Sequence, residues 1–335
     1  MLGEGERRRI ALTVSCRDTD VIPKVADAGV VRDGVQVMFN GVVVEEGCYY
    51  GEWMTEVIKD LRGHHEPQEE LVFHAIIERL AATSSSPAVL ELGAFWAWYS
   101  LWALHRIPAA RAFCVEPDPA YLEKGKRNFA LNGRAGTFHL AAVGQGPTPP
   151  QPFLCESDGI ERPIPFEGLA SLLDRFALDR AELVLVDVQG AETSLLDGAR
   201  DLLRDGRVRF MVISTHHHVI SNDALTHQRC LMLLKELGAH VIAEHTVAES
   251  FSGDGLIAVS FDPQDRDLEV IISRCRVGES WFGDPLWDLD AARSSDDDAG
   301  AVRVELADLR AQLADIERTR TWKLRNALNR ALGRS

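Results

Sequence analysis

Apolar residues in the middle of the chain follow two alternating patterns. Nearly continuous apolar runs at 88–92 and 183–188 are typical of strands that are buried on both faces of a parallel sheet. Residues 121–131 and 192–203 instead have helical character. This alternation of strand and helix predicts an α/β fold, in which helices connect the strands and cover both faces of one sheet.

We expect seven strands in this sheet. They are Ala88–Leu92, Ala112–Glu116, Thr137–Val143, Leu183–Val188, Val208–Ser214, His240–His245 and Leu256–Phe261. The Ser- and Gly-rich connection between the last two is too short for a helical crossover, so it predicts an antiparallel hairpin at the sheet edge. A Rossmann-like sheet of seven strands with this ending is more typical of a methyltransferase than of a dehydrogenase.

Before the sheet, residues 1–66 are predicted to form a small β-rich lead-in, which can close over the main domain as a lid. Its expected strands are Ile10–Val14, Val35–Phe39 and Gly41–Val44, with a turn signal at Asn40-Gly41. Helical spacing of apolar residues follows from Pro67 to Ala82, and we expect the main domain to span residues 67–283. A further helix is expected at 222–237.

The C-terminal part of the chain differs from the main domain in composition. Residues 284–300 are polar and acidic and are interpreted as a linker before a helical segment at 301–335. Residues 302–316 contain about two heptads, a candidate contact for a homo-oligomer. Residues 318–335 form a basic amphipathic tail with six basic and no acidic residues, which predicts contact with an anionic membrane surface or a partner protein. A solvated tail is the alternative.

The formal net charge of −15 argues against a general nucleic-acid binder, because phosphate binding needs a basic surface. The six cysteines are scattered without a C-x-x-C pair, as expected for reduced thiols. No uninterrupted apolar stretch approaches 18 residues, and the N-terminus lacks the apolar core of a signal peptide. We therefore expect a cytoplasmic protein, with peripheral contact at the inner face of the membrane through its tail.

Acidic residues stand at the ends of the first two predicted strands of the sheet. Glu91 is followed by a turn at Gly93, and Glu116 is followed by Pro117. Ligands of an open parallel sheet bind outside the carboxyl ends of its strands. An acid at the second tip can accept hydrogen bonds from both hydroxyls of a ribose, while the turn at the first tip lets backbone approach an aminoacyl group.

The two acidic tips together therefore predict a nucleoside cofactor. Phe95, in the first turn, and Ala142, in the third strand, complete the candidate cofactor contacts. No G-x-G-x-x-G motif is present here, so a pyrophosphate-binding dehydrogenase is disfavoured. Two alternatives stay open: the acids can be ordinary strand-end charges, and the aromatic residues around this turn can be core packing.

Three sequence blocks resemble the FkbM family of S-adenosylmethionine-dependent methyltransferases. They are VLELGAFWAWYSLWA at 89–103, FCVEPDPAYLEKGKRNFALNG at 113–133 and LVDVQGAETSLLDGA at 185–199. The third block is similar to the family signature D-[IV]-[EQ]-G-x-E, whereas the first keeps one of its usual three glycines. The resemblance covers roughly residues 10–262. It implies S-adenosylmethionine as cofactor and a hydroxyl of a glycan or glycosylated metabolite as acceptor, in O-methylation during surface-polysaccharide biosynthesis.

Methyl transfer to a hydroxyl needs alignment of the two reactants and removal of a proton. Asp187 follows the fourth strand and is the first candidate for a catalytic residue that also contacts the cofactor; a helix cap is its alternative role. His216 follows the fifth strand and is the candidate general base. Gln189 and Glu192 are candidate substrate contacts on the same turn as Asp187, although Glu192 can also be a first-turn acid.

A divalent metal is a less favoured possibility, with Asp187, His216 and His218 as its ligands if the fifth strand continues through His218. His218 is otherwise a candidate substrate contact. In the lead-in, Tyr50 and Trp53, with His65 just before the first long helix, combine aromatic and polar groups that suit sugar recognition. A turn packed on the core is the alternative for these residues.

Two other functions remain open on the sequence alone. The chain can be an N- or carboxyl-methyltransferase of a small metabolite. It can also be a non-catalytic scaffold with the same fold in a polysaccharide assembly, because the first turn is poor in glycine.

Overall fold

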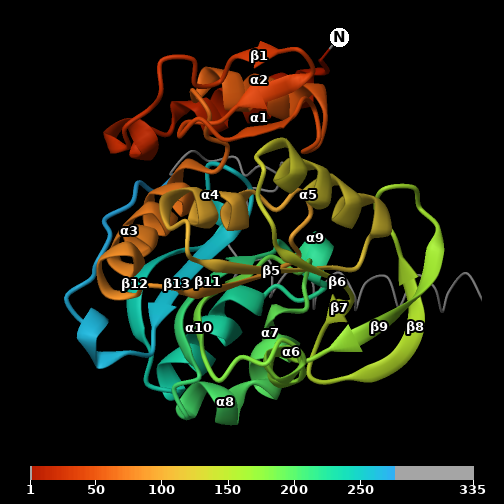
Figure 1. Ribbon diagram of the computed structural model, residues 1–335, viewed down its shortest axis with the longest axis vertical. Helices are drawn as coiled ribbons and strands as arrows, with labels where there is room; N and C mark the ends of the chain where they lie inside the picture. Colours follow the sequence, from red (N-terminus) through yellow and green to blue (C-terminus); the bar gives the residue numbers. More distant parts are fainter. Residues whose placement is uncertain (1, 276–335) are drawn as a thin grey trace, which may run out of the picture. The chain divides into compact units, whose positions relative to one another are not determined.

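A computed structural model describes residues 2–275 and contains the predicted Rossmann-like sheet at its centre (Figure 1). The strand order is β12-β13-β11-β10-β4-β5-β6. The strands are β4 (Ala88–Leu92), β5 (Arg111–Glu116), β6 (Thr137–Leu140), β10 (Ala181–Val186), β11 (Val208–Thr215), β12 (His240–His245) and β13 (Gly255–Ser260). Each lies at or within a few residues of the range that the hydrophobic pattern predicts.

The strand directions place the ends of four strands side by side. β4 pairs in parallel with β5 and β10, and β10 pairs in parallel with β11. β13 runs antiparallel to both β11 and β12, which confirms the predicted hairpin at the sheet edge. In the β4–β5 register Glu91 is opposite Cys114. The carboxyl ends of β4, β5, β10 and β11 therefore meet along one edge of the sheet.

Helices cover both faces of the sheet (Figure 1). One face carries α3 (Pro67–Thr83), α4 (Trp98–Arg106) and α5 (Pro119–Leu131). The other carries α6 (Leu169–Arg175), α7 (Glu192–Gly198), α8 (Arg200–Arg204) and α10 (Thr226–Glu236). The predicted continuous helix over 192–203 is interrupted at Ala199, and the helix predicted at 222–237 begins only at Thr226, after the one-turn α9 (His218–Ser221).

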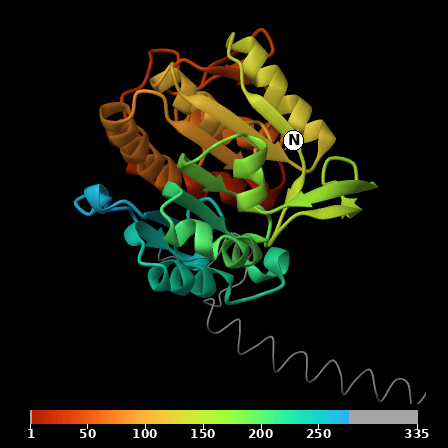
Figure 2. The ribbon, with the colours of Figure 1, turned by 60° about the horizontal axis from the view of Figure 1, so that its bottom comes forward.

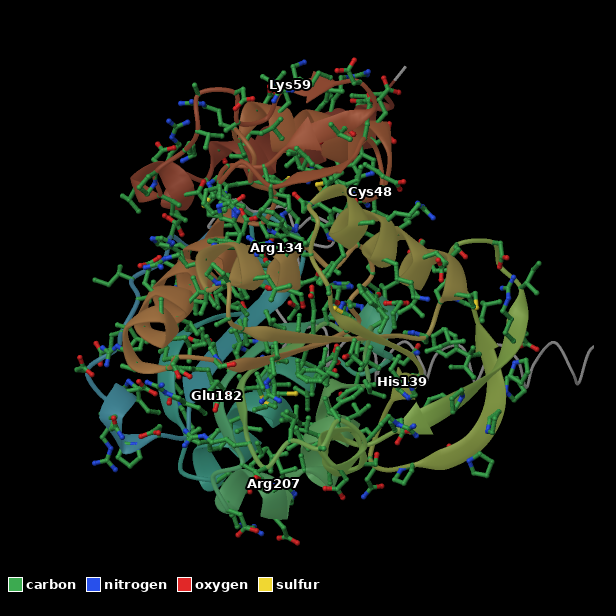
Figure 3. The ribbon with its side chains drawn as sticks, in the orientation of Figure 1. Cys48, Lys59, Arg134, His139, Glu182 and Arg207 are labelled. Atoms are coloured by element: carbon green, nitrogen blue, oxygen red, sulfur yellow. The ribbon has the colours of Figure 1, made fainter. Side chains whose placement is uncertain are left out.

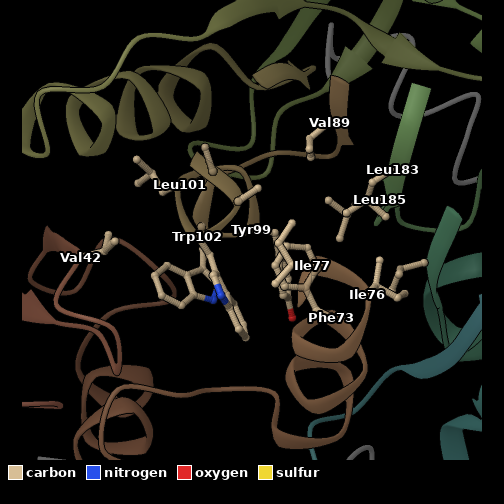
Figure 4. Packing of buried hydrophobic residues seen from close by; sticks show 14 of the residues in the cluster. Val42, Phe73, Ile76, Ile77, Val89, Tyr99, Leu101, Trp102, Leu183 and Leu185 are labelled. Carbon is tan, nitrogen blue, oxygen red and sulfur yellow. The ribbon is translucent and has the colours of Figure 1, made fainter. Parts of the chain in front are cut away.

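Two apolar cores form on the two faces of the sheet. The first joins Phe73 and Ile76 of α3 with Trp102 of α4 and with Leu183 and Leu185 of β10 (Figure 4). The second contains the apolar residues of α6, α7 and α10 packed against the opposite side of the same strands. Because side chains of β4 and β10 contribute to both cores, these strands read as continuous apolar runs in the sequence.

The lead-in begins with a helix, which corrects one prediction. Residues Ile10–Val14, expected as a strand, lie within α1 (Glu4–Ser15). Glu4 and Glu6 in the first turn favour a helix here, and Ile10 and Val14 then reach the core from one face. After it come the antiparallel strands β1 (Val31–Arg32), β2 (Val35–Val37) and β3 (Val43–Glu45), and then α2 (Glu52–Asp60).

Two asparagines, one in α5 and one directly after it, hold the lead-in against the main domain. The Asn128 side chain accepts a hydrogen bond from Glu45 N at 2.9 Å and donates one to Trp96 O at 3.0 Å. Asn132 exchanges hydrogen bonds with the backbone of Val43. Figure 3 shows Cys48 at this junction between the lead-in and α5. The position of the lead-in is thus fixed by buried polar contacts.

The third predicted strand is divided between two sheets, a second correction. β6 ends at Leu140, and β7 (Ala142–Val143) pairs instead with β9 (Glu161–Glu167) in a separate three-stranded sheet. The remaining strand is β8 (Thr148–Leu154), which forms an antiparallel hairpin with β9 beside the main sheet (Figure 2). This hairpin was not predicted, because its strand TPPQPFL contains three prolines, which usually argue against a strand.

The predicted linker at 284–300, the oligomer contact at 302–316 and the basic tail at 318–335 lie outside the described residues. Within residues 2–275, every helix is too short or too polar to cross a lipid bilayer.

Candidate active site

A deep pocket opens at the carboxyl ends of β4, β5, β10 and β11, where the topology brings the four strand tips together. Its volume is about 1070 Å³. Glu91, Glu116 and Asp187 line it from the strand side, and the lead-in and the β8–β9 hairpin supply the remaining walls. The pocket is large enough for a nucleoside cofactor together with a second, drug-sized ligand.

The first turn of the pocket requires Gly93. This glycine has a φ of 78°, and a Cβ at its position would lie 1.7 Å from the backbone oxygen of Asp187. Phe95 and Ala97, where the family pattern has glycines, also adopt left-handed φ values of 40° and 58°. The turn therefore keeps its shape without the two missing glycines, at a cost in backbone strain of the kind found at functional sites.

The predicted acidic tips are buried and held by backbone amides. Glu91 accepts a hydrogen bond from Ser100 N at 3.0 Å. Glu116 accepts one from Phe95 N at 3.0 Å and one from Asp118 N at 2.9 Å, so each of its oxygens keeps a lone pair for a ligand. Burial raises the pKa of Glu91 to about 7 and that of Glu116 to about 8.

His216 lies between two carboxylates on the opposite side of the pocket. Its Nδ1 is 2.5 Å from Oε1 of the buried Glu192, which fixes the orientation of the imidazole ring. Its Nε2 is 3.1 Å from Oδ1 of Asp187. Neither Nε2 nor this Oδ1 makes a hydrogen bond to any residue in the described range, although both atoms are buried. A polar nitrogen and a polar oxygen thus face the pocket together, ready for a ligand group.

The charges around His216 are coupled. Burial lowers its pKa, but Asp254, Asp187 and Glu192 outweigh that effect and hold the pKa well above its usual value. The hydrogen bond from His216 in turn keeps the pKa of Glu192 low in spite of burial. The carboxylates around His216 therefore favour the protonated form of its imidazole.

Asp254 is a pocket residue that the sequence interpretation missed. Its position directly before Gly255 is typical of a turn residue, yet its Oδ1 lies 3.9 Å from His216 Nε2. Removal from water raises the pKa of Asp254 to about 7. Only the presence of an acid directly before β13 pointed to it in the sequence, and such acids are common in turns.

A second wall of the pocket comes from the lead-in and the start of α3. Tyr50, Trp53 and His65 line it as predicted, together with Tyr49 and Glu66. The side chains of Tyr49 and Tyr99 each donate a hydrogen bond to Glu66, at 3.3 and 3.0 Å. His65 Nε2 lies 3.2 Å from the same carboxylate. Glu66 is thus fixed by three donors while it faces the pocket.

The β8–β9 hairpin closes a third side of the pocket. Phe153 and Glu156 line the interior. At the hairpin tip, Ser157 donates two hydrogen bonds to Asp118, from its N–H at 2.9 Å and from its hydroxyl at 2.8 Å. Asp118 also caps the first turn of α5. This single carboxylate therefore connects the hairpin to the strand tip that carries Glu116.

Most of the predicted site residues line the pocket. They are Tyr50, Trp53, His65, Glu91, Gly93, Phe95, Glu116, Pro117, Ala142, Asp187, Gln189 and His216. Glu192 lies behind His216 instead of in the pocket wall, so its predicted substrate contact is replaced by a contact to the imidazole.

His218 does not join the other predicted metal ligands. β11 ends at Thr215, so the strand does not continue through His218, which begins α9 and is not among the pocket residues. Within the part of the chain that the structure describes, no three His, Cys, Asp or Glu side chains are grouped to hold a metal ion.

Comparison with known families identifies the central part of the chain. Residues 91–241 match the family model described as the methyltransferase FkbM domain. This range contains Glu91, Glu116, Asp187 and His216, whereas the lead-in wall lies outside it. No curated protein matches the sequence.

Several solved structures are similar to part of this chain at low sequence identity. The precorrin-6y C5,15-methyltransferase of Geobacter metallireducens is 16% identical, with 57% of this chain and 86% of that chain covered and a TM-score of 0.37. TrmK of M. capricolum in complex with S-adenosyl-homocysteine is 11% identical over 58% of this chain and 74% of its own, with a TM-score of 0.36. The METTL16 methyltransferase domain is 13% identical over 78% and 97%, with a TM-score of 0.40.

Proposed function

From the premise that residues 91–241 belong to the FkbM methyltransferase family, we propose that the protein is an S-adenosylmethionine-dependent O-methyltransferase. Its acceptor is a sugar hydroxyl of a surface polysaccharide or of a glycosylated metabolite. The observation that carries this proposal is the position of His216 Nε2 and Asp187 Oδ1, two buried atoms that form an ion pair at 3.1 Å at the edge of the strand-tip pocket and make no hydrogen bond to any other residue in the described range.

The strand side of the pocket fits S-adenosylmethionine. Glu116 keeps acceptor capacity on both oxygens, as needed for two ribose hydroxyls. The turn at Gly93 packs against the backbone of Asp187 and lines the pocket beside Glu91, where the aminoacyl group of the cofactor would lie. When bound, this cofactor supplies an electrophilic methyl group on a positively charged sulfur. The acidic side chains Glu91, Glu116 and Asp187 line this side of the pocket and favour a positively charged ligand, because a bound cation stabilises their ionised forms.

The chain's own contribution to the reaction is alignment and proton removal. As the oxygen–methyl bond forms and the sulfur–methyl bond breaks, the proton of the acceptor hydroxyl passes to His216 Nε2. Glu192 holds the ring so that Nε2 faces the pocket, and Asp187 stabilises the imidazolium that results. A cation bound nearby lowers the pKa of His216, so the filled pocket favours the neutral base.

The acceptor side of the pocket supports a sugar. Aromatic faces next to fixed carboxylates are suited to the apolar face and the hydroxyl rim of a sugar ring, and Tyr50, Trp53 and Glu66 supply these groups. The pairing of His216 Nε2 with Asp187 at the pocket edge favours a catalyst over a non-catalytic scaffold, because a paired imidazole and carboxylate that line a pocket are suited to proton transfer.

A labelled methyl donor tests the proposal. The full chain is incubated with methyl-labelled S-adenosylmethionine and glycan extracts from its host, and the product is identified by mass spectrometry. We expect label on a sugar oxygen, and a rate about 100-fold or more lower for His216→Asn with unchanged S-adenosylhomocysteine binding. Label on nitrogen or on a carboxylate, or equal rates for the two proteins, would contradict the proposal.

A further inference from the structure

The pocket is lined by more acidic than basic residues among those described. Besides Glu91 and Glu116 at the tips of β4 and β5, the acidic residues that line the pocket are Glu66, Glu69, Asp118, Glu156, Asp187 and Asp254. The pocket's basic residues among those described are Arg9, His65 and His216. Each of the two imidazoles lies within 3.2 Å of a carboxylate of the protein. Any positive charge on them is therefore compensated by the protein itself.

Glu66 is the most firmly positioned of these acids. It stands directly before α3, and its side chain is 15% exposed. The hydroxyls of Tyr49 and Tyr99 and the ring of His65 hold it from the protein side. A half-buried carboxyl group with this many donors is pre-organised, so a ligand does not have to order it on binding. A carboxylate accepts hydrogen bonds and repels anions.

Aromatic rings define where a ligand beside Glu66 would lie. Tyr49 stacks on Trp96 at 4.8 Å between ring centroids, and Tyr50 meets Phe95 edge to face at 5.4 Å. These contacts hold Tyr49 and Tyr50 in place between Glu66 and the first turn. His216, only 3% exposed and with an unbonded Nε2, lines the same pocket and is an independent sign that a polar ligand group belongs there.

We infer that Glu66 receives hydrogen bonds from a non-reacting group of the acceptor, and that the pocket selects acceptor rings without negative charge. This inference rests on the proposed function and specifies the acceptor class. A sugar ring with a protonated amine donates the strongest hydrogen bonds to Glu66, and a neutral ring with hydroxyls donates weaker ones. A uronic acid or a phosphorylated sugar places an anion among carboxylates in a site that is shielded from water.

Three matched ligands test the inference with a binding readout. The full chain, saturated with S-adenosylhomocysteine, is titrated with methyl glucoside, methyl glucosaminide and methyl glucuronide in ligand-observed NMR. We expect the amine to bind more tightly than the neutral ring, and the uronate at least tenfold more weakly than the neutral ring. Equal or tighter binding of the uronate would overturn the inference, as would the absence of binding for all three sugars while S-adenosylhomocysteine binds.

A pair of variants assigns the effect to Glu66. Glu66→Gln is expected to reduce the difference between amine and uronate about tenfold and to leave S-adenosylhomocysteine affinity unchanged. Glu78→Gln is the matched control, because Glu78 is on the same helix α3 but pairs with Arg106 at the surface. If Glu66→Gln does not change the order or the ratios of the three sugar affinities, Glu66 does not determine the selectivity for the charge of the acceptor. Loss of S-adenosylhomocysteine binding by the unmodified protein would instead contradict the proposed function.

Discussion

At the scale of single residues, the site depends on side chains whose orientation is fixed by neighbouring side chains. Glu192 touches His216 from outside the pocket, and Glu66 is oriented by two tyrosines and a histidine. The contact between Nδ1 and Glu192 sets the orientation of the His216 ring, so its Nε2 has a defined position beside Asp187. Such support is what allows a general base to meet its proton in a defined geometry.

Glu192→Gln tests this support. The amide can still accept a hydrogen bond from Nδ1, but it carries no charge, so the pKa of His216 should fall. We expect a roughly tenfold lower kcat and a shift of the rising limb of the kcat/KM profile to lower pH. The pH profile of methyl transfer is the measurement, with the exposed Glu123→Gln as control. A lower kcat without a shifted limb would mean that Glu192 has only a structural role.

Gly93 can be tested by stability. Gly93→Ala adds a Cβ 1.7 Å from a backbone oxygen, whereas Gly133→Ala, at a similar positive φ of 59°, meets open space. The control should lose about 1 kcal/mol from backbone strain alone, and Gly93→Ala about 3 kcal/mol or more. Thermal unfolding of both variants measures the difference. Equal losses would show that the first turn can move away from Asp187 at no cost.

At the scale of elements, the sheet was predictable because its strands are apolar on both faces. The carboxyl-end position of Glu91, Glu116 and Asp187 follows from that pattern with the rule for parallel sheets. The elements that depend on tertiary contacts were not predictable. The β8–β9 hairpin contains prolines, and α1 has the short β-branched run that suggested a strand. The pocket role of Asp254 depends on the fold of β13 beside β11.

The hairpin provides a prediction at this scale. Ser157→Ala removes one of the two hydrogen bonds that fasten the hairpin tip to Asp118. We expect faster amide hydrogen exchange across residues 148–167 and a three- to tenfold weaker affinity for S-adenosylhomocysteine. Asp158→Asn is the control, because Asp158 is at the same tip but pairs with Arg162 instead of Asp118. Unchanged exchange in Ser157→Ala would show that other contacts hold the hairpin closed.

At the scale of the whole molecule, the acidic pocket links stability to pH. The pKa values of Glu91, Glu116 and Asp254 are raised to about 7, 8 and 7, and that of His65 is raised to about 10. Groups with raised values bind protons more tightly in the folded state, so they stabilise it at low pH and lose that effect as pH rises. The pKa of Glu70 is instead lowered to about 2. Glu70 therefore stabilises the folded protein above the usual pKa of a carboxyl group and loses that effect as the pH falls.

The expected result is a melting temperature of the ligand-free protein that is highest near about pH 4–5, close to the usual carboxyl pKa values, and falls towards about pH 8. A bound cation compensates the ionised carboxylates, so S-adenosylmethionine should raise the melting temperature more at pH 8 than at pH 6. The uncharged sulfur of S-adenosylhomocysteine should give a smaller difference. A flat melting temperature between pH 5 and 8, or equal behaviour of the two ligands, would contradict this linkage.

The whole account requires that the strand-tip pocket binds an adenosyl amino acid through Glu116. Isothermal titration of S-adenosylhomocysteine into the full chain and into Glu116→Ala measures this directly. We predict one site per chain, with an affinity at least tenfold weaker in the variant, while Glu123→Ala on the exposed face of α5 binds like the unmodified protein. Heat of binding that is absent from the unmodified protein, or identical in all three, would contradict the central claim.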